Sequence, residues 1–428
     1  MNGTDWSAVY DPVWYAAVNP DVADWATGAD GSIDGDKLLG HFVNNGRKEG
    51  RASKEGFELA SYYNANADLR RAFGTDWARY YDHYRSSGQR EGRACAGVNA
   101  LRGAVTSRDG VDWSPVYDAV YYARQNPDVA RWATRSFSSG SVLDDVALLQ
   151  HFASSGAKEA RRSSEAFDVR SYYNANSDLR YAFGGTADWS RYYRHYATNG
   201  AREGRKCTGV DELQGTVTKL NGTDWSAVYD RAYYGQKNSD IVGWATRKCG
   251  SATVLDDYAM LTHFVNNGRK EGRAGNASFE LASYYNANAD LRKAFGTDWA
   301  RYYDHYRGNG QKEGRTATGV GQLRNAATVL ENVNWAPAYD ANFYAQRNSD
   351  VANWARRSFS SGSVIDDAAL LAHFVNSGTK EARASKADFD VRAYKSKNSD
   401  LASAFGSDWK SYYRHYAKFG VNEHRPCV

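Results

Sequence analysis

Histidine is the side chain whose recurrence in this sequence most directly suggests chemistry, because a neutral imidazole binds metals and titrates near neutral pH. A zinc site requires several His or Cys ligands within a few ångströms, and no second His or Cys lies one helical turn from any of these residues. We therefore predict that each histidine forms hydrogen bonds within its own module, and that the chain holds no metal or cofactor. Eight of the nine histidines recur at spacings of about 42–44 and 68 residues: His41, His83, His151, His195, His263, His305, His373 and His415.

A Glu-x-Arg motif follows each of these histidines, and its middle residue varies among Gly, Ala and His. A planar guanidinium can cap carbonyl groups at the end of a helix and pair with a carboxylate of a neighbouring module. A role that recurs in every module is more consistent with structure than with catalysis, so we predict structural ion pairs. The motifs are Glu49/Arg51, Glu91/Arg93, Glu159/Arg161, Glu203/Arg205, Glu271/Arg273, Glu313/Arg315, Glu381/Arg383 and Glu423/Arg425.

Tyrosines cluster around every second histidine, as in the sequence YYDHY at residues 80–84. Exposed rings of this kind could stack on sugars. The equivalent residues 38–42 are LLGHF, and positions that accept leucine are packing positions, so we expect most of these tyrosines to be buried. The candidates to face a ligand are the first tyrosines of the four clusters: Tyr80, Tyr192, Tyr302 and Tyr412.

The composition also indicates a core filled by rings, since 31 Tyr and 13 Trp stand against only 2 Met. Such a core needs hydrogen-bond partners for its hydroxyls and indole nitrogens. Twelve of the 13 tryptophans fall at three recurring positions per copy, typified by Trp6, Trp25 and Trp77. We predict that all three positions serve packing.

Residues 30–36, DGSIDGD, place oxygen-bearing side chains at alternate positions, as at the beginning of an EF-hand calcium loop. The twelfth position, where such a loop requires a bidentate Glu, is His41, and the other copies lack the pattern. We predict a solvated loop.

Cysteines are sparse, and Cys95, Cys207 and Cys427 occupy the same place two residues after a Glu-x-Arg motif. Cys249 stands in a connector loop where other copies carry Phe137 and Phe359. If the tail of one copy contacts that loop of the next copy, Cys207 and Cys249 meet. We predict a disulfide between them, which would fit an oxidising, extracellular setting.

Motifs for nucleophilic or phosphoryl-transfer catalysis are absent: the sequence has no G-x-S-x-G, no H-E-x-x-H and no P-loop. The recurring carboxylates are those assigned above to caps and Arg pairs. We predict that the chain is not an enzyme. A glycan hydrolase is a distant alternative, and it would need a cleft with two unpaired carboxylates about 5–10 Å apart.

A long internal repeat positions these residues. The unit is about 110 residues long, and identical segments such as HFVNNGRKEGRA recur about 222 residues apart, so the four copies follow an ABAB order. We place the copies at residues 1–105, 106–217, 218–328 and 329–428.

Each copy divides into two related halves, and each half has the pattern of three short helices. In the second half of copy one, Asn66 stands at an N-cap position, and Gly88 is placed to end the third helix in the left-handed conformation. No window alternates like a strand over a useful length. We predict an all-α tandem repeat array, elongated and curved because each copy contacts only its neighbours.

The charge distribution argues against binding to nucleic acid. The formal net charge is +4, and the charged residues, 24% of the composition, are interspersed and not gathered into a basic patch. No apolar stretch approaches the roughly 18 residues that would span a membrane.

The half-repeat, with Asn-x-Asp-Leu/Val followed by His-Phe/Tyr-x-x-x-Gly-x-x-Glu-Gly-Arg, resembles a short tandem module of secreted and surface proteins of bacteria. The resemblance covers the whole chain and departs at Ala160, Ala382 and His424 inside the Glu-x-Arg motifs. It implies an extracellular location, at the cell surface or secreted, often beside cell-wall hydrolases.

Our leading hypothesis is a non-catalytic module that binds cell-wall glycan or peptidoglycan through aromatic and Arg side chains in grooves between copies. The alternative is an adhesin that binds a surface protein, or a structural spacer.

Overall fold

The computed structural model describes residues 3–428, and the chain divides into two compact units. Unit 1 consists of residues 3–215 together with 247–254, and unit 2 consists of residues 216–246 together with 255–428. Buried residues form one core cluster in unit 2 and two in unit 1. Each unit is described below by itself.

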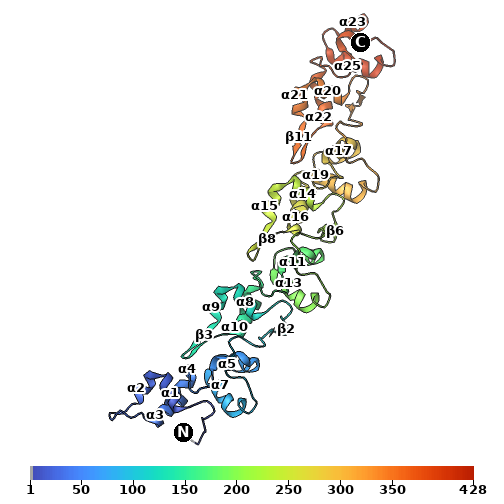
Figure 1. Cartoon of the computed structure of the whole chain (residues 1–428). Coiled ribbons are helices and arrows are strands. Elements are labelled where there is room, and N and C mark those ends of the chain that lie inside the picture. Colours follow the sequence, from blue (N-terminus) through green and yellow to red (C-terminus); the bar gives the residue numbers. More distant parts are fainter. Residues whose placement is uncertain (1–2) are drawn as a thin grey trace. The chain divides into compact units, whose positions relative to one another are not determined.

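Short helices of six or seven residues build each half-repeat, and the third continues into a five-residue π-helical turn (Figure 1). In copy 1 the first half has α1 (Pro12–Val18), α2 (Pro20–Ala26), α3 (Gly35–His41), η1 (Phe42–Gly46) and α4 (Arg47–Glu49), and the second has α5 (Leu59–Ala65), α6 (Ala67–Phe73), α7 (Trp77–His83) and η2 (Tyr84–Gly88). In copy 2 the helices are α8 (Ala119–Gln125), α9 (Pro127–Ala133), α10 (Asp145–His151), η3 (Phe152–Gly156), α11 (Val169–Ala175), α12 (Ser177–Phe183), α13 (Trp189–His195) and η4 (Tyr196–Gly200).

Copies 3 and 4 repeat this order. Copy 3 has α14 (Arg231–Lys237), α15 (Ser239–Ala245), α16 (Asp257–His263), η5 (Phe264–Gly268), α17 (Leu281–Ala287), α18 (Ala289–Phe295), α19 (Trp299–His305) and η6 (Tyr306–Gly310). Copy 4 has α20 (Ala341–Arg347), α21 (Ser349–Trp354), α22 (Asp367–His373), η7 (Phe374–Gly378), α23 (Val391–Lys397), α24 (Ser399–Phe405), α25 (Trp409–His415) and η8 (Tyr416–Gly420).

Small antiparallel hairpins accompany the helices, so the predicted all-α class is incomplete. Their strands have only two or four residues, which is too short for an alternating pattern to stand out in the sequence. The connectors hold β1 (Ser107–Arg108) with β2 (Val111–Asp112), β5 (Lys219–Leu220) with β6 (Thr223–Asp224), and β9 (Val329–Leu330) with β10 (Val333–Asn334). The first halves of copies 2 to 4 hold β3 (Thr134–Phe137) with β4 (Gly140–Leu143), β7 (Thr246–Cys249) with β8 (Ala252–Leu255), and β11 (Arg356–Phe359) with β12 (Gly362–Ile365).

In each half, a buried tyrosine hydroxyl in the first helix is hydrogen-bonded to the histidine at the end of the third helix. In the first half of copy 1, Tyr15 Oη lies 2.9 Å from His41 Nδ1, and a Cβ added to Gly46 would lie 2.3 Å from the same oxygen. Glycine is therefore required here by close approach of the ring, not by a left-handed backbone. This corrects the role predicted for Gly88, which faces Tyr62 Oη in the same way. The eight pairs are Tyr15/His41, Tyr62/His83, Tyr122/His151, Tyr172/His195, Tyr234/His263, Tyr284/His305, Tyr344/His373 and Tyr394/His415.

The asparagine between the first two helices joins them by its side chain and does not form the predicted N-cap bond. Asn19 Nδ2 donates to the carbonyls of Tyr15 and Ala52, each at 2.9 Å, and Asn66 Nδ2 donates to the carbonyl of Tyr62 at 2.8 Å. The amide thereby satisfies carbonyls at the end of the preceding helix.

A buried ion pair joins copy 1 to copy 2 within unit 1. Arg70 Nε donates to Asp145 at 3.1 Å, and both side chains have no exposed surface. The other guanidinium nitrogens of Arg70 donate to four backbone carbonyls, including those of Arg102 and Gly103 in the connector. In unit 2, Arg292 pairs with Asp367 at 3.2 Å in the same way. Neither pair was predicted from the sequence.

The hairpin of the following copy closes each of these two joints. From copy 2, Ser138 N donates to the carbonyl of Glu49 at 2.8 Å, and the Phe137 ring lies 5.1 Å from that of Trp77. Ser139 Oγ donates to the carbonyl of Gly50 at 2.6 Å. In unit 2 the same contacts recur with Phe359, Ser360 and Ser361 on copy 3.

We expect Gly46→Ala to destabilise unit 1 by about 2 kcal/mol or more, because the methyl group displaces Tyr15 from its bond with His41. Gly40→Ala is the matched control, since nothing lies within 4 Å of an added Cβ there. It should be neutral or stabilise helix α3 by up to about 1 kcal/mol. Urea unfolding measures both, and an equal effect of the two variants would contradict this role of the bond between Tyr15 and His41.

Arg70→Ala should cost about 3–5 kcal/mol, because it leaves the carboxylate of Asp145 buried without its cation. The adjacent Arg71 is exposed, so Arg71→Ala is the control and should change the free energy of unfolding by less than about 0.5 kcal/mol. Denaturant unfolding followed by Trp fluorescence measures the difference. A cost below 1 kcal/mol for Arg70→Ala would contradict the assignment of this joint.

Candidate functional site

The eight histidines lie within their own halves, each bonded to its tyrosine as described above. Burial lowers the pKa of five of them, which favours the neutral imidazole at neutral pH: His151, His195, His263, His373 and His415. Nε2 of these rings has no hydrogen-bond partner among residues 3–428. No group of three or more His, Cys, Asp or Glu side chains in that range could hold a metal ion.

The Glu-x-Arg motif closes a network inside its own half and does not reach the neighbouring module. Arg51 Nε donates to Glu49 at 2.6 Å, and its two terminal nitrogens each donate to a carboxylate oxygen of Asp21 at 2.8 Å. Asp21 stands in the first turn of α2, where an anion is favourable. The middle residue is left-handed in all eight motifs, with φ between +51° and +68°, which explains its preference for Gly. Glu91 and Arg93 form the same network with Asp68.

The four tyrosines selected as ligand-facing are buried, so this prediction is wrong. Tyr80, Tyr192, Tyr302 and Tyr412 are all 0% exposed. Tyr80 Oη donates to the carbonyl of Gly74 at 2.8 Å, and its ring packs against Phe73 and Trp77. The hydroxyl is therefore hydrogen-bonded to the backbone of its own half and is not available to a ligand.

All four cysteines are free thiols, so the predicted disulfide between Cys207 and Cys249 is not formed in this structure. Both are buried in the same core cluster of unit 1. Cys207 Sγ instead contacts Tyr196 Oη at 3.1 Å, and burial raises the pKa of Cys249 to about 12. The Asp-rich loop of copy 1 caps a helix, since Asp34 accepts from the backbone N–H groups of Asp36 and Lys37.

One of the three recurring tryptophan positions is exposed in every copy, in contrast to the packing role predicted for it. Copy 1 also exposes Trp14, which lies outside the recurring positions, to 36%. At the recurring position, the exposed fractions are 58% for Trp25, 53% for Trp132, 50% for Trp244 and 57% for Trp354. Each lies in the second helix of its first half, with the ring centroid 5.7–5.9 Å from that of the histidine of that half. The chain therefore carries four equivalent surface platforms of an indole beside an imidazole.

Polar groups surround these platforms in a copy-dependent way. In copy 2 the guanidinium of Arg135 lies over the Trp132 ring at 5.7 Å and pairs with Asp144 at 3.2 Å. In copy 4 Arg357 donates to the carbonyl of Trp354 and pairs with Asp366. Copy 1 has Gly28 in place of this arginine. Each platform thus offers an apolar face beside hydrogen-bonding groups.

The four platforms could have been found by comparing the two halves of each copy. Where the first halves carry Trp25, Trp132, Trp244 and Trp354, the second halves carry Ala72, Ala182, Ala294 and Ala404. The next residue of the second half, such as Phe73, then takes the place beside the histidine. The fold therefore accepts alanine where the first halves expose an indole.

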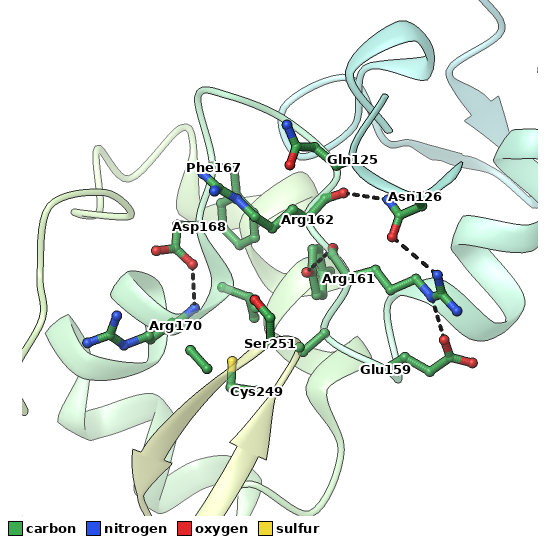
Figure 2. A pocket seen from close by; sticks show the side chains of 15 residues that line it. Gln125, Asn126, Glu159, Arg161, Arg162, Phe167, Asp168, Arg170, Cys249 and Ser251 are labelled. Atoms are coloured by element: carbon green, nitrogen blue, oxygen red, sulfur yellow. Dashed lines mark hydrogen bonds and ion pairs between the residues drawn. The ribbon is translucent and has the colours of Figure 1, made fainter. Parts of the chain in front are cut away.

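A groove of about 680 Å³ in unit 1 is the second candidate site (Figure 2). It lies between the halves of copy 2 and the hairpin tip at residues 249–252. Phe167, Tyr193 and Cys249 line it with buried side chains, while Gln125 and Arg162 bring polar groups. The equivalent groove of copy 3 measures about 310 Å³.

Comparison of the chain with protein families, with curated proteins and with solved structures gives no match. Among the described residues, no helix has the length and apolar character needed to cross a membrane.

The lowered histidine pKa values predict that stability falls as the pH decreases. An imidazole whose folded pKa lies below its unfolded value of about 6.5 takes up its proton preferentially in the unfolded state. Its contribution to stability is complete above that pH and is lost as the pH falls through the folded pKa. We expect Tm to be flat between about pH 7.5 and 8.5 and to fall between about pH 7 and 5. NMR titration of the five imidazoles with a lowered pKa is the direct measurement, and values at or above 6.5 for these five would contradict this prediction.

Proposed function

We propose that the chain is a non-catalytic repeat module of a bacterial surface or secreted protein, and that it binds cell-wall glycan or peptidoglycan through the exposed tryptophans of the four platforms. The observation that carries this proposal is the recurrence of a half-exposed indole at one position in all four copies. An exposed ring of this size is unfavourable to hydrate, and the second halves fold with alanine at the same position.

The chemistry of the platforms suits a sugar ring. A pyranose has one face of C–H groups that packs on an aromatic ring, and hydroxyls around its edge that need partners. Beside each indole, the imidazole Nε2 supplies such a partner, and Arg135 adds a guanidinium in copy 2. Four sites on one chain also suit a polymer, because each further contact becomes intramolecular once the first has formed.

The proposed location outside the cell rests on the resemblance of the half-repeat to modules of exported bacterial proteins. The alternative is a protein-binding adhesin or spacer, since tryptophan and arginine also anchor protein interfaces.

Replacing Trp25, Trp132, Trp244 and Trp354 together by Ala should abolish retention of the chain on purified cell wall. Single replacements should weaken retention in steps, because the sites act additively on one polymer. Co-sedimentation with cell wall and a glycan array are the measurements, with circular dichroism to confirm folding.

Tyr181→Ala is the matched control, since Tyr181 is a 40% exposed aromatic residue outside the platforms. It should leave retention unchanged. If the unaltered chain is retained neither by cell wall nor by any arrayed glycan, glycan binding is ruled out and protein binding becomes the leading function.

A further inference from the structure

The groove of copy 2 is larger than the groove of copy 3, and the residues packed at the joints differ between the two. At the joints of copies 1 and 2 and of copies 3 and 4, a left-handed glycine receives the aromatic residue of the hairpin. A Cβ added to Gly50 would lie 2.7 Å from Cβ of Phe137, and one added to Gly272 would lie 2.6 Å from Cβ of Phe359. The glycine and the phenylalanine therefore depend on each other.

Copy 2 carries Ala160 at this position, and the hairpin that faces it carries Cys249 and Gly250. A phenylalanine ring at residue 249 would add a contact that a cysteine lacks, since Cδ2 of Phe137 lies only 2.9 Å from a Cβ added to Gly50. Gly250 lies against the carbonyl of Ala160, where an added Cβ would come within 2.6 Å. The loss of the phenylalanine ring accounts for the larger volume of this groove.

The enlarged groove is also edged by exposed polar side chains that have no partner in the described part of the chain and are free to bind a ligand. The side chains of Gln125, Arg162 and Ser251 form no hydrogen bond or ion pair within residues 3–428. At the closed joints, by contrast, the equivalent hydroxyls of Ser139 and Ser361 donate to Gly50 and Gly272. Arg162 occurs in copy 2 alone, since the other copies have alanine at its position: Ala52, Ala274 and Ala384.

The other two arginines of the groove each have an ion-pair partner. Arg161 pairs with Glu159 and Asp128, and Arg170 pairs with Asp211. The carboxylate of Asp168 caps α11 by accepting from Arg170 N at 2.9 Å and from Ser171 Oγ at 3.1 Å, as Figure 2 shows for the first contact. Arg162 is therefore the guanidinium available to a ligand.

We propose that this groove is a binding site, one per chain, for a carboxylate-bearing sugar. The guanidinium of Arg162 binds the carboxylate, for which its planar fork is suited, and the amide of Gln125 and the hydroxyl of Ser251 bind ring hydroxyls. Phe167, Tyr193 and Cys249 give the groove an apolar floor. The volume lies within the roughly 300–1,000 Å³ typical of small-molecule sites. This inference deepens the proposed glycan binding and rests on it for the choice of a sugar.

Isothermal titration of the full chain with sodium glucuronate tests the proposal, with glucose and acetate as partial ligands. We expect one glucuronate per chain and binding of glucose and acetate at least tenfold weaker. Arg162→Ala should weaken glucuronate binding at least tenfold, and it should not disturb folding because three copies already have alanine there.

The double variant Ala160→Gly/Cys249→Phe reproduces the pair found at the closed joints, and it should narrow the groove toward the about 310 Å³ of copy 3 and abolish binding. Absence of saturable glucuronate binding, binding that both variants retain, or equal binding of acetate would overturn the proposal. The variant that lacks the four platform tryptophans should still bind one glucuronate, so failure at the groove is distinguishable from failure of the platforms.

Discussion

The burial of a tyrosine hydroxyl between a histidine and a glycine is the constraint on which each half depends. Helices of six or seven residues do not persist alone, because nucleation costs more than so few hydrogen bonds return. Tyr15 joins the first helix of a half to the end of the third through His41, and Gly46 leaves room for its ring. The Arg51 network then ties the chain after the π-helical turn to the first turn of the second helix. Rings and ion pairs therefore replace helix length as the source of order.

Much of this arrangement could be predicted from the sequence because it recurs. The repeat itself, the short helices and the burial of most tyrosines follow from patterns that appear many times, so chance agreement is small. The failures have local causes. Gly88 was assigned by its position at a helix end, although the ring that excludes a side chain there comes from Tyr62, 26 residues earlier. The pairing of Arg70 with Asp145 joins residues 75 positions apart, and no local pattern relates them.

The candidate sites were missed for a different reason. Comparison of the sister halves predicts burial for the tyrosines, whereas the hydrophobic character of Trp25 by itself favours a packing role. Applied to both, the same comparison separates them: leucine replaces the buried tyrosines, whereas alanine replaces the exposed indoles. A position that tolerates loss of the whole ring contributes little to the core. A large apolar residue retained there in four copies is better explained by what it contacts outside the fold.

The joints between copies also depart from the repeat at particular residues. A repeat array is stable when neighbouring copies pack closely. The same close packing occurs at two joints, where Phe137 lies against Gly50 and Phe359 lies against Gly272. The methyl group of Ala160 is incompatible with the same packing, and the exchange of phenylalanine for cysteine at residue 249 removes the ring contact together with its buried surface. Packing alone would favour the closed pair, since refilling such a space recovers about 25 cal/mol for each Å² of apolar surface removed from water. Arg162 is exposed at the edge of the opened space and has no partner in the described part of the fold, so packing does not account for a guanidinium at this position. The lost ring and the added guanidinium both face the same groove, and the two departures are accounted for together if a ligand occupies it.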